Sequence, residues 1–339
     1  MAEKSIEVPA DVGYAWVIAL ASFIMQVCAS GSMSGFGVFM EYYSNEIFPE
    51  ENKSNVAMIG NLAPTVIGIA SVVTGQLCQN FGVRFCIILG ALFMAAGHVL
   101  ASFGTEVWHF ALTQGVMVGL GGALLYVPAN VIVTEWFQKK HGLAAGIGAA
   151  GAGLGGVAFS QMNSRMLEKI GYECTLRLNG LLIFSALLLS ALMIRRRETK
   201  PTENQAAGFH SSLILNGRFF WYAISCLCGG TVYLIPLYYI NSHATSMGLS
   251  RIEGGYASSA INFGSGVGRI GMGFLGDKIG YMRCYLLAIA LTTVTSVIWR
   301  FSTSFTMLMV FGILYGIPSG GYAGGFGPIC AFIFGNKYK

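Results

Sequence analysis

Charged side chains are scarce in this sequence: they make up 10% of its 339 residues, against about a quarter in an ordinary soluble domain. Proline is also rare, with 8 residues, whereas glycine is frequent, with 46. The low charge excludes a surface that faces water over most of its area, and abundant glycine with little proline argues against a disordered or collagen-like chain. With 54% hydrophobic residues and a mean hydropathy of +0.63, the composition indicates helices packed closely together in lipid.

Motifs for catalysis, metal binding and nucleotide binding are also lacking. Most of the eight cysteines lie in apolar runs without a zinc-like spacing, so we interpret them as small apolar side chains. Gly151-x-Gly153-x-x-Gly156 has the spelling of a dinucleotide fingerprint, but it lies in an uncharged run without a preceding strand, and close helix packing explains it better. A Walker-type phosphate loop is missing too. We therefore expect no enzymatic activity, no cofactor, no metal and no nucleic-acid partner.

Ten runs of mostly apolar residues dominate the chain, each of the order of the 20 residues that a membrane-spanning helix needs. They lie at 16–40, 57–79, 85–103, 108–133, 142–162, 178–195, 219–241, 254–276, 284–300 and 305–333. Soluble helices are apolar on one stripe only, so these runs predict an all-α membrane protein with about ten transmembrane helices. A single run, 254–276, carries a charge deep inside it, which is Arg269.

Basic residues divide unevenly between the loops on the two sides of these runs. The side of the N-terminus holds thirteen Lys and Arg residues and the opposite side holds six. Basic loops stay in the cytoplasm, so we expect a multi-pass protein with a cytoplasmic N-terminus and, by default, a plasma-membrane location. The outer loop with the sequon Asn52-Lys53-Ser54 is short, so an unoccupied chance match is favoured over a glycosylation site.

The chain contains an internal repeat. A shift of 198 residues superposes Gly75 on Gly273, Gln79 on Asp277 and Gly82 on Gly280. The same shift places Lys139 on Lys337, so the second half would lack counterparts of its last two helices. We therefore predict the following organisation: a cytoplasmic segment 1–15, a six-helix half 16–195, a cytoplasmic linker 196–218 and an incomplete four-helix half 219–339.

The segment GFLGDKIG at 273–280 resembles the cytoplasmic loop motif of the major facilitator superfamily, Gly-x-Leu-x-Asp-x-x-Gly. Its glycines let helices approach, and its aspartate can latch one conformation by pairing with a cation or a helix N-terminus. The resemblance implies two halves of six helices with the substrate between them, so ten helices stand where twelve are expected. The gating residues that it implies are Gly75, Gly82 and Arg84 in the first copy and Gly273, Asp277 and Gly280 in the second.

The chain also resembles the monocarboxylate-porter family, in particular its fungal branch. The resemblance rests on DVGYAW at 11–16, WFQKKHGLAAGIGAAGAGLGG at 136–156, IGYECTLRLNG at 170–180 and GVGRIGMGFLGD at 266–277. Proton-coupled animal members carry a lysine in the first helix and an aspartate one turn before the arginine of the eighth. Ser34 and Ser265 occupy these positions here, so the resemblance does not extend to proton-linked lactate transport.

Arg269 is the foremost candidate for substrate binding. A charge in the middle of a spanning helix costs about 2.5–3.5 kcal/mol on insertion scales, so such residues usually face a cavity and act on an ion or substrate. A guanidinium suits the bidentate capture of a carboxylate. The alternative is that Arg269 reaches the nearby cytoplasmic surface or pairs locally. The further candidates, for each of which a structural hydrogen bond is the alternative, are Ser34, Tyr126, Asn130, Tyr233, Ser265 and Tyr322.

These observations favour a secondary transporter that moves a small organic acid or related metabolite by alternating access. Its partners would be a small-molecule substrate, optionally a co-transported proton, and the lipid bilayer, with the oligomeric state undetermined. Export of a fungal secondary metabolite is the alternative within transport. A sensor derived from a transporter, or an inert truncation, is the alternative outside it, because two expected helices are missing.

Overall fold

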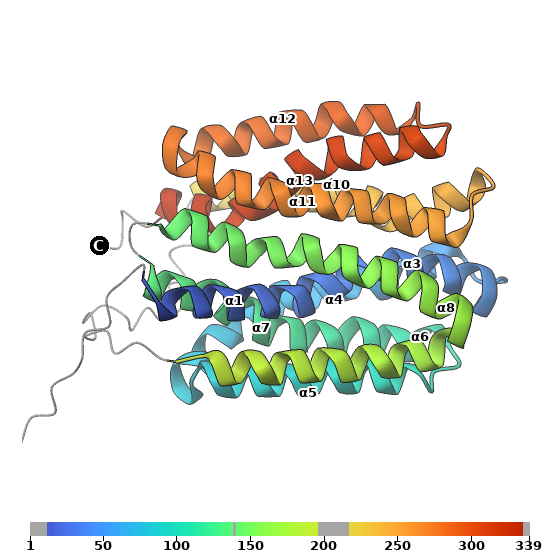
Figure 1. Ribbon diagram of the computed structural model, residues 1–339, viewed down its shortest axis with the longest axis horizontal. Helices are drawn as coiled ribbons and strands as arrows, with labels where there is room; N and C mark the ends of the chain where they lie inside the picture. The colour runs from blue at the N-terminus through green and yellow to red at the C-terminus, as the bar shows by residue number, and fades with distance from the viewer. Residues whose placement is uncertain (1–11, 138–139, 196–216, 335–339) are drawn as a thin grey trace, which may run out of the picture.

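The structure is a computed structural model that describes residues 12–137, 140–195 and 217–334. Long helices run side by side along one axis and form nearly all of it (Figure 1), so the predicted all-α membrane fold is confirmed. Helices suit lipid because they satisfy every backbone polar group within the segment. We call the helices before and after the predicted linker the first and the second half. The first half contains α1 (Tyr14–Gln26), η1 (Val27–Gly31), α2 (Ser32–Ser34), α3 (Phe36–Tyr42), η2 (Tyr43–Ile47), α4 (Lys53–Phe81), α5 (Val83–Ala101), α6 (Val107–Phe110), η3 (Ala111–Met117), α7 (Val118–Trp136) and α8 (His141–Met193).

The second half contains α10 (Gly217–Ser246), α11 (Arg251–Ile279), α12 (Tyr281–Trp299) and α13 (Phe305–Phe334). We call the end of the bundle where α1 begins and α13 finishes the terminal end (Figure 1, left). The opposite end, which carries the turns 48–52 and 247–250, is the distal end. The predicted linker 196–218 lies, apart from its last two residues, outside the described residues, and so does most of the predicted segment 1–15.

Within the described ranges, eight helices are long and apolar enough to cross a membrane, whereas the sequence predicted ten runs. Part of the difference is α8, which holds two of the predicted runs. Gly171, with φ 75°, breaks it, and its two arms run in opposite directions (Figure 1). A left-handed φ of this kind suits glycine because it has no Cβ. The segment Gly142–Met193 has 52 residues and is apolar on average, so α8 is long enough to cross twice.

The other difference is α11, which is long enough but not apolar enough to count among the eight spans. Sixteen of its 29 residues are buried, and most of these are glycine, alanine or serine. Such residues favour close contact with other helices over contact with lipid. The predicted run 254–276 is therefore an internal helix, which packs on the first arm of α8 and on α13.

The two halves meet through glycines on α8 and α11. Gly153 of α8 lies against the backbone of Gly266, and Gly273 of α11 lies against the carbonyl of Gly142. A Cβ at either position would overlap backbone atoms, so only glycine permits this approach. The interpretation of the glycines at 151–156 as packing residues agrees with these contacts.

The internal repeat is visible in the backbone. Gly82, between α4 and α5, has φ 86°, and Gly280, between α11 and α12, has φ 93°. In each copy of the repeat the chain turns from one helix into the next at this glycine. A positive φ of this size strains any residue that has a Cβ, so glycine suits the turn. The two copies of the motif therefore form the same tight turn at the terminal end of the bundle.

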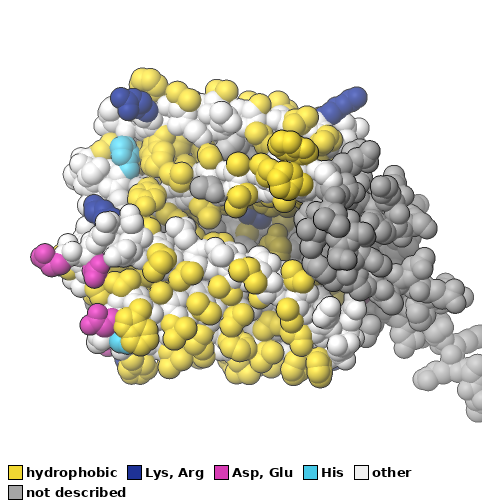
Figure 2. All heavy atoms as spheres, turned by 180° about the vertical axis from the view of Figure 1, so that it is seen from behind, with side chains coloured by type: hydrophobic (Ala, Val, Ile, Leu, Met, Phe, Trp, Pro, Cys, Tyr) yellow, Lys and Arg dark blue, Asp and Glu magenta, His cyan; other side chains and the backbone are white. Residues whose placement is uncertain are grey.

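The outer surface has the character expected of a protein in lipid. Large hydrophobic side chains point outward along the spans, among them Leu181, Leu192 and Leu286, which are 63%, 71% and 58% exposed. Figure 2 shows hydrophobic side chains spread over the middle of one face, with acidic side chains gathered at the distal end. A soluble protein rarely exposes so large a contiguous apolar surface.

Candidate functional site

Arg269 lies on α11 inside the bundle, with 8% of its surface exposed. Its Nη2 donates a hydrogen bond to the Tyr233 hydroxyl of α10 at 3.5 Å. Its Nε is buried and has no hydrogen-bond partner in the described part of the chain. A buried charge is costly unless it is paired, so this guanidinium has unused capacity to bind an anion.

Two further predicted residues lie close to Arg269. Tyr126 comes from α7 in the other half, and it is near enough to interact electrostatically with both Arg269 and Tyr233. Ser265 lies one turn before Arg269 on α11, and its buried Oγ lacks a hydrogen-bond partner in the described ranges. Donor groups on α7, α10 and α11 therefore lie in the neighbourhood of Arg269, and Tyr233 is the one hydrogen-bonded to it in the described part of the chain.

The other three predicted substrate-binding residues are engaged elsewhere. The Ser34 hydroxyl donates to the Ser30 carbonyl at 3.0 Å, and the Asn130 amide donates to the Tyr126 carbonyl at 2.7 Å. Each of these bonds lies within a single helical turn. Tyr322 stacks on Tyr285, with ring centroids 5.4 Å apart, in an aromatic cluster of the second half. The structure therefore brings Tyr126, Tyr233 and Ser265 to Arg269, but not these three.

The two copies of the predicted gating motif have different surroundings. In the first copy, Arg84 donates from Nε to the Ile194 carbonyl at 2.8 Å, which ties the turn at Gly82 to the end of α8 in the same half. In the second copy, Asp277 accepts a hydrogen bond from Tyr281, and its carboxylate lies beside Gly142 in the first turn of α8. A carboxylate at a helix N-terminus is stabilised by the helix dipole, so Asp277 forms a favourable contact across the two halves.

A cavity of about 960 Å³ lies at the terminal end of the first half, beside the first motif copy. Its lining includes Gly75, Gly82 and Arg84, together with residues of α7 such as Glu135. Arg269 is not among the lining residues. The first copy of the predicted gating motif therefore borders open space at the terminal end of the bundle.

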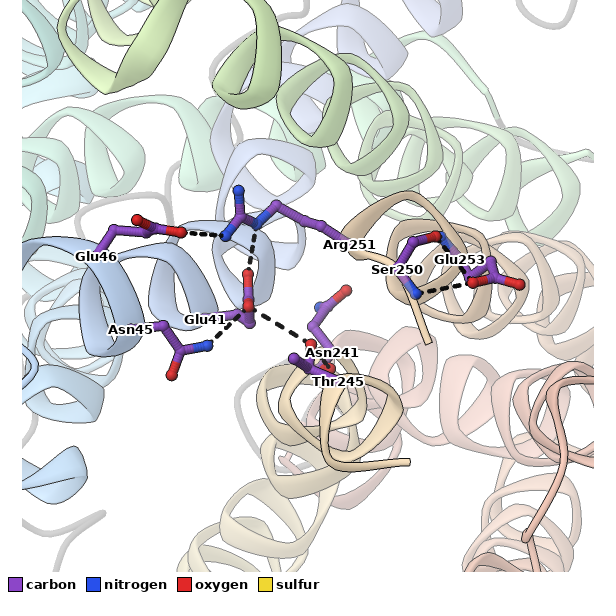
Figure 3. Close-up of polar contacts among 8 residues, drawn as sticks. All are labelled: Glu41, Asn45, Glu46, Asn241, Thr245, Ser250, Arg251 and Glu253. Atoms are coloured by element: carbon purple, nitrogen blue, oxygen red, sulfur yellow. Dashed lines mark hydrogen bonds and ion pairs between the residues drawn. The ribbon is translucent and has the colours of Figure 1, made fainter. Parts of the chain in front are cut away.

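Sequence reasoning missed a group of charged residues at the distal end. Arg251, the first residue of α11, donates from Nε to Glu41 of α3 at 2.7 Å, and its Nη2 lies 3.2 Å from Glu46 (Figure 3). Glu41 is only 3% exposed. The available signal was an acidic loop in the first half and a basic residue in a loop of the second, but residues 210 positions apart cannot be paired from sequence alone.

Glu41 has two more hydrogen-bond donors in the same cluster. Asn45, one turn further along the same segment, donates from Nδ2 to Glu41 at 2.8 Å, and Thr245 of α10 donates from its hydroxyl at 3.5 Å (Figure 3). Asn241, one turn before Thr245, is 3% exposed, and neither its Nδ2 nor its Oδ1 has a partner within the described ranges. A satisfied buried carboxylate and an unsatisfied buried amide therefore lie next to each other.

The sequon residue Asn52 is exposed at the distal end and caps the N-terminus of α4. Its Oδ1 accepts a hydrogen bond from the Ser54 backbone N–H at 3.0 Å. Capping satisfies one of the free N–H groups of the first helical turn, which is sufficient reason for an asparagine here. Within the described residues, His, Cys, Asp and Glu do not gather in groups of three that could hold a metal ion.

Helices from before and after the predicted linker surround a buried, incompletely paired cation, and a solved structure of a membrane protein has the same fold. The structure resembles that of a bacterial homolog of the human lysosomal transporter Spinster, in an inward-facing and unoccupied conformation. The TM-score is 0.64 at 18% identity, over 93% of this chain and 75% of the other. Residues 22–338 match the Major Facilitator Superfamily, and the chain belongs to this family.

Relatives from fungi agree with this assignment. The chain is 31% identical to the probable transporter MCH2 of Saccharomyces cerevisiae, over 92% of this chain and 67% of the relative. It is 30% identical to the fujikurins efflux protein of Gibberella fujikuroi, over 93% and 69%. It spans 48% of another yeast relative, the uncharacterized transporter ESBP6. Since these relatives are transporters, the family agrees with the expectation that this chain is not an enzyme.

Proposed function

We propose that this protein is a secondary transporter of an organic anion, which binds at Arg269 between the two halves. The observation that carries the proposal is the buried guanidinium with a free Nε, faced by Tyr233 and by Tyr126 from the other half. A carboxylate bound there would contact both halves at once. Anion binding would then be coupled to their relative position, which alternating access requires.

A small organic acid is the substrate class that these side chains support best. Arg269 supplies the charge and the paired donors that match a carboxylate. Tyr233 offers a hydroxyl 3.5 Å from the Arg269 Nη2, and Ser265, one helical turn before Arg269, offers an unpaired hydroxyl. The resemblance to monocarboxylate porters points the same way. A proton is a candidate co-substrate, although the serines at 34 and 265 replace the ionisable residues that proton-coupled members use.

Export of a fungal secondary metabolite is the second candidate function. It is favoured by the match to the fujikurins efflux protein and by a 27% match to the agnestins efflux protein of Paecilomyces divaricatus. The stacked rings of Tyr285 and Tyr322, with Phe326 edge-on to Tyr322, add an apolar and aromatic surface to the second half. Such a surface would suit a larger, partly aromatic acid.

The proposed orientation follows from the division of basic loop residues. The terminal end, with the first motif copy and Arg84, would face the cytoplasm, and the distal end, with Glu41 and Asn52, would face the outside or a lumen. The positive-inside rule supports this orientation and the cytoplasmic N-terminus. The plasma membrane remains the default location for a protein of this kind.

Uptake by the purified chain in lipid vesicles tests the proposal. The vesicles are offered a panel of short monocarboxylates and larger aromatic acids, and wild type is compared with Arg269→Gln and Arg269→Lys. Hydrogen bonds to charged groups contribute about 1.5–3 kcal/mol each, so Arg269→Gln is expected to lower kcat/KM by at least about tenfold. Lysine keeps the charge without the planar fork and is expected to give an intermediate value.

Arg300→Gln is the matched control, since this arginine is exposed just after α12, at the distal end and away from Arg269. Its uptake should equal that of wild type. Unchanged uptake in Arg269→Gln would remove Arg269 from the mechanism. If well-folded wild-type protein moves none of the acids, the sensor or inert alternative replaces transport. Faster uptake of a short monocarboxylate supports the small organic acid, and faster uptake of a larger aromatic acid supports the secondary metabolite. A pH-sensitive dye inside the vesicles records proton movement.

A further inference from the structure

An ion pair with a buried carboxylate and a partly buried guanidinium joins the two halves at the distal end. Glu41 comes from the first spanning segment, whereas Arg251 begins α11 and is separated from it by 210 positions (Figure 3). The 2.7 Å contact is short and direct, and side-chain exposure is 3% for Glu41 and 18% for Arg251. A buried pair of this kind is costly to break on one side, because the remaining charge is left without a partner.

The position of Arg251 is unfavourable for its own helix. Ser250 and Glu253 form a capping box at the start of α11, so negative and capping groups already occupy this N-terminus. A cation in the first turn opposes the positive end of the helix dipole. Stability of α11 therefore does not explain an arginine here, whereas the carboxylates of Glu41 and Glu46 across the interface do.

Asn241 acts in the opposite direction. It is buried between Gly37 of α3 and Gly254 of α11, and its side chain lacks hydrogen-bond partners within the described ranges. A buried, unpaired amide favours any conformation that lets water reach it. When the distal ends of the halves are in contact, the ion pair stabilises that contact and the amide opposes it, so the two states are kept close in free energy.

We propose that Glu41 and Arg251 are positioning residues that latch the distal ends of the two halves together, and that transport requires this latch to open. The inference rests on the proposed alternating access, but the contact itself is a property of the chain. Loss of either charge shifts the protein toward states in which the distal interface is open. Glu46 does not share this role, because its side chain is 53% exposed and its 3.2 Å contact with Arg251 is screened by water.

A cysteine at Leu237 reports the state of the latch. Leu237 is 2% exposed on α10, one turn before Asn241, and its carbonyl lies against Gly37 of the other half. The reporter Leu237→Cys is made in full-length protein together with Cys174→Ser, which removes an exposed native thiol. The labelling rate with a hydrophilic maleimide is measured on detergent-solubilised protein, and the same chain without Leu237→Cys sets the background.

In this background, Glu41→Gln and Arg251→Gln are each expected to raise the labelling rate about tenfold. Removing one partner leaves the other charge unpaired at the interface, which favours the open state. The double variant should label no faster than either single variant, because one interaction cannot be lost twice. Glu46→Gln, the matched exposed carboxylate, should label at the original rate. Arg251→Lys, which keeps the charge, should give an intermediate rate and serves if a neutral variant fails to fold.

Unchanged labelling in Glu41→Gln, additive effects in the double variant, or an equal effect of Glu46→Gln would each overturn the latch. The assay needs no substrate, so its failure is distinguishable from failure of the transport proposal. Protein that labels as expected but transports no acid would retain the latch and refute the transport function. Protein that transports an acid, with labelling that is insensitive to Glu41, would refute the latch alone.

Discussion

Ser34 and Ser265 occupy the positions at which proton-coupled relatives carry ionisable side chains, yet the structure gives them different surroundings. The Ser34 hydroxyl is bonded to the Ser30 carbonyl within its own helix. Ser265 lies one turn from Arg269 and is 1% exposed. Its hydroxyl has no hydrogen-bond partner in the described part of the chain. The Ser265 hydroxyl is therefore available to a ligand, whereas the Ser34 hydroxyl is already used within its own helix.

This difference predicts unequal effects of removing the two hydroxyls. Ser265→Ala is expected to raise KM for an anionic substrate several-fold, since a typical hydrogen bond contributes about 0.5–1.5 kcal/mol. Ser34→Ala should change it little, and initial uptake rates over a range of substrate concentrations measure both. A larger effect at Ser34 than at Ser265 would place the substrate near the first helix, away from Arg269.

Helix α11 is the element on which most of the candidate function depends. It carries Arg251, Ser265, Arg269 and Asp277 at successive levels from the distal to the terminal end. Its buried glycines allow α8 and α13 to approach, so the helix contacts both halves along its length. The same small and polar residues that make it a poor membrane span by composition make it the central element of the bundle.

Gly75 and Gly273 occupy equivalent positions in the repeat, but we expect their substitution by alanine to change helix stability in opposite directions. Gly273 faces the backbone carbonyl of Gly142, so Gly273→Ala should lower the melting temperature and the uptake rate. A Cβ at Gly75 would meet no other atom within 4 Å. Gly75→Ala should therefore stabilise α4 by about 0.5–1 kcal/mol, because glycine is the poorer helix former.

Thermal unfolding of the two detergent-solubilised variants tests the pair directly. A destabilised Gly75→Ala together with an unaffected Gly273→Ala would mean that the first copy of the motif, rather than the second, makes the close contact between helices.

At the scale of the whole molecule, the charges mark the two ends of the bundle. Acidic side chains gather at the distal end (Figure 2), and Arg84 and Asp277 lie at the terminal end. Exposed hydrophobic side chains cover the helices between them. The division of basic residues supports the proposed direction of this arrangement, in which the terminal end would face the cytoplasm.

The native thiol of Cys174 tests that direction. Cys174 is exposed and follows the distal turn at Gly171, next to the charged residue Glu173. A membrane-impermeant maleimide is expected to label it in intact cells that express the chain, and Cys174→Ser should abolish this signal. Gln79→Cys, an exposed position at the terminal end, should react in the Cys174→Ser background only after permeabilisation. The reverse pattern would invert the orientation.

Local features were sufficient to predict the membrane class, most of the apolar spans and the superfamily. A membrane span depends on about 20 consecutive residues, so it is visible in the sequence without knowledge of the fold. Arg269 stands out for the same reason, as a charge within an apolar run. The repeat of Gly82 at Gly280 can also be read from the sequence, and both glycines adopt a positive φ between two helices. The organisation into halves and the two missing helices stay predictions.

Tertiary structure alone decided which polar groups meet. Glu41 and Arg251 looked like ordinary loop charges until the fold placed them 2.7 Å apart. Ser265 differs from Ser34 only through the helices that surround it. Hydrogen bonds and ion pairs act over a few ångströms between residues far apart in the chain, whereas hydropathy accumulates along it. The sequence by itself therefore determined that this chain lies in a membrane and which long apolar segments it has. The packing of α8, α10 and α11 decided which of its few charges can act together.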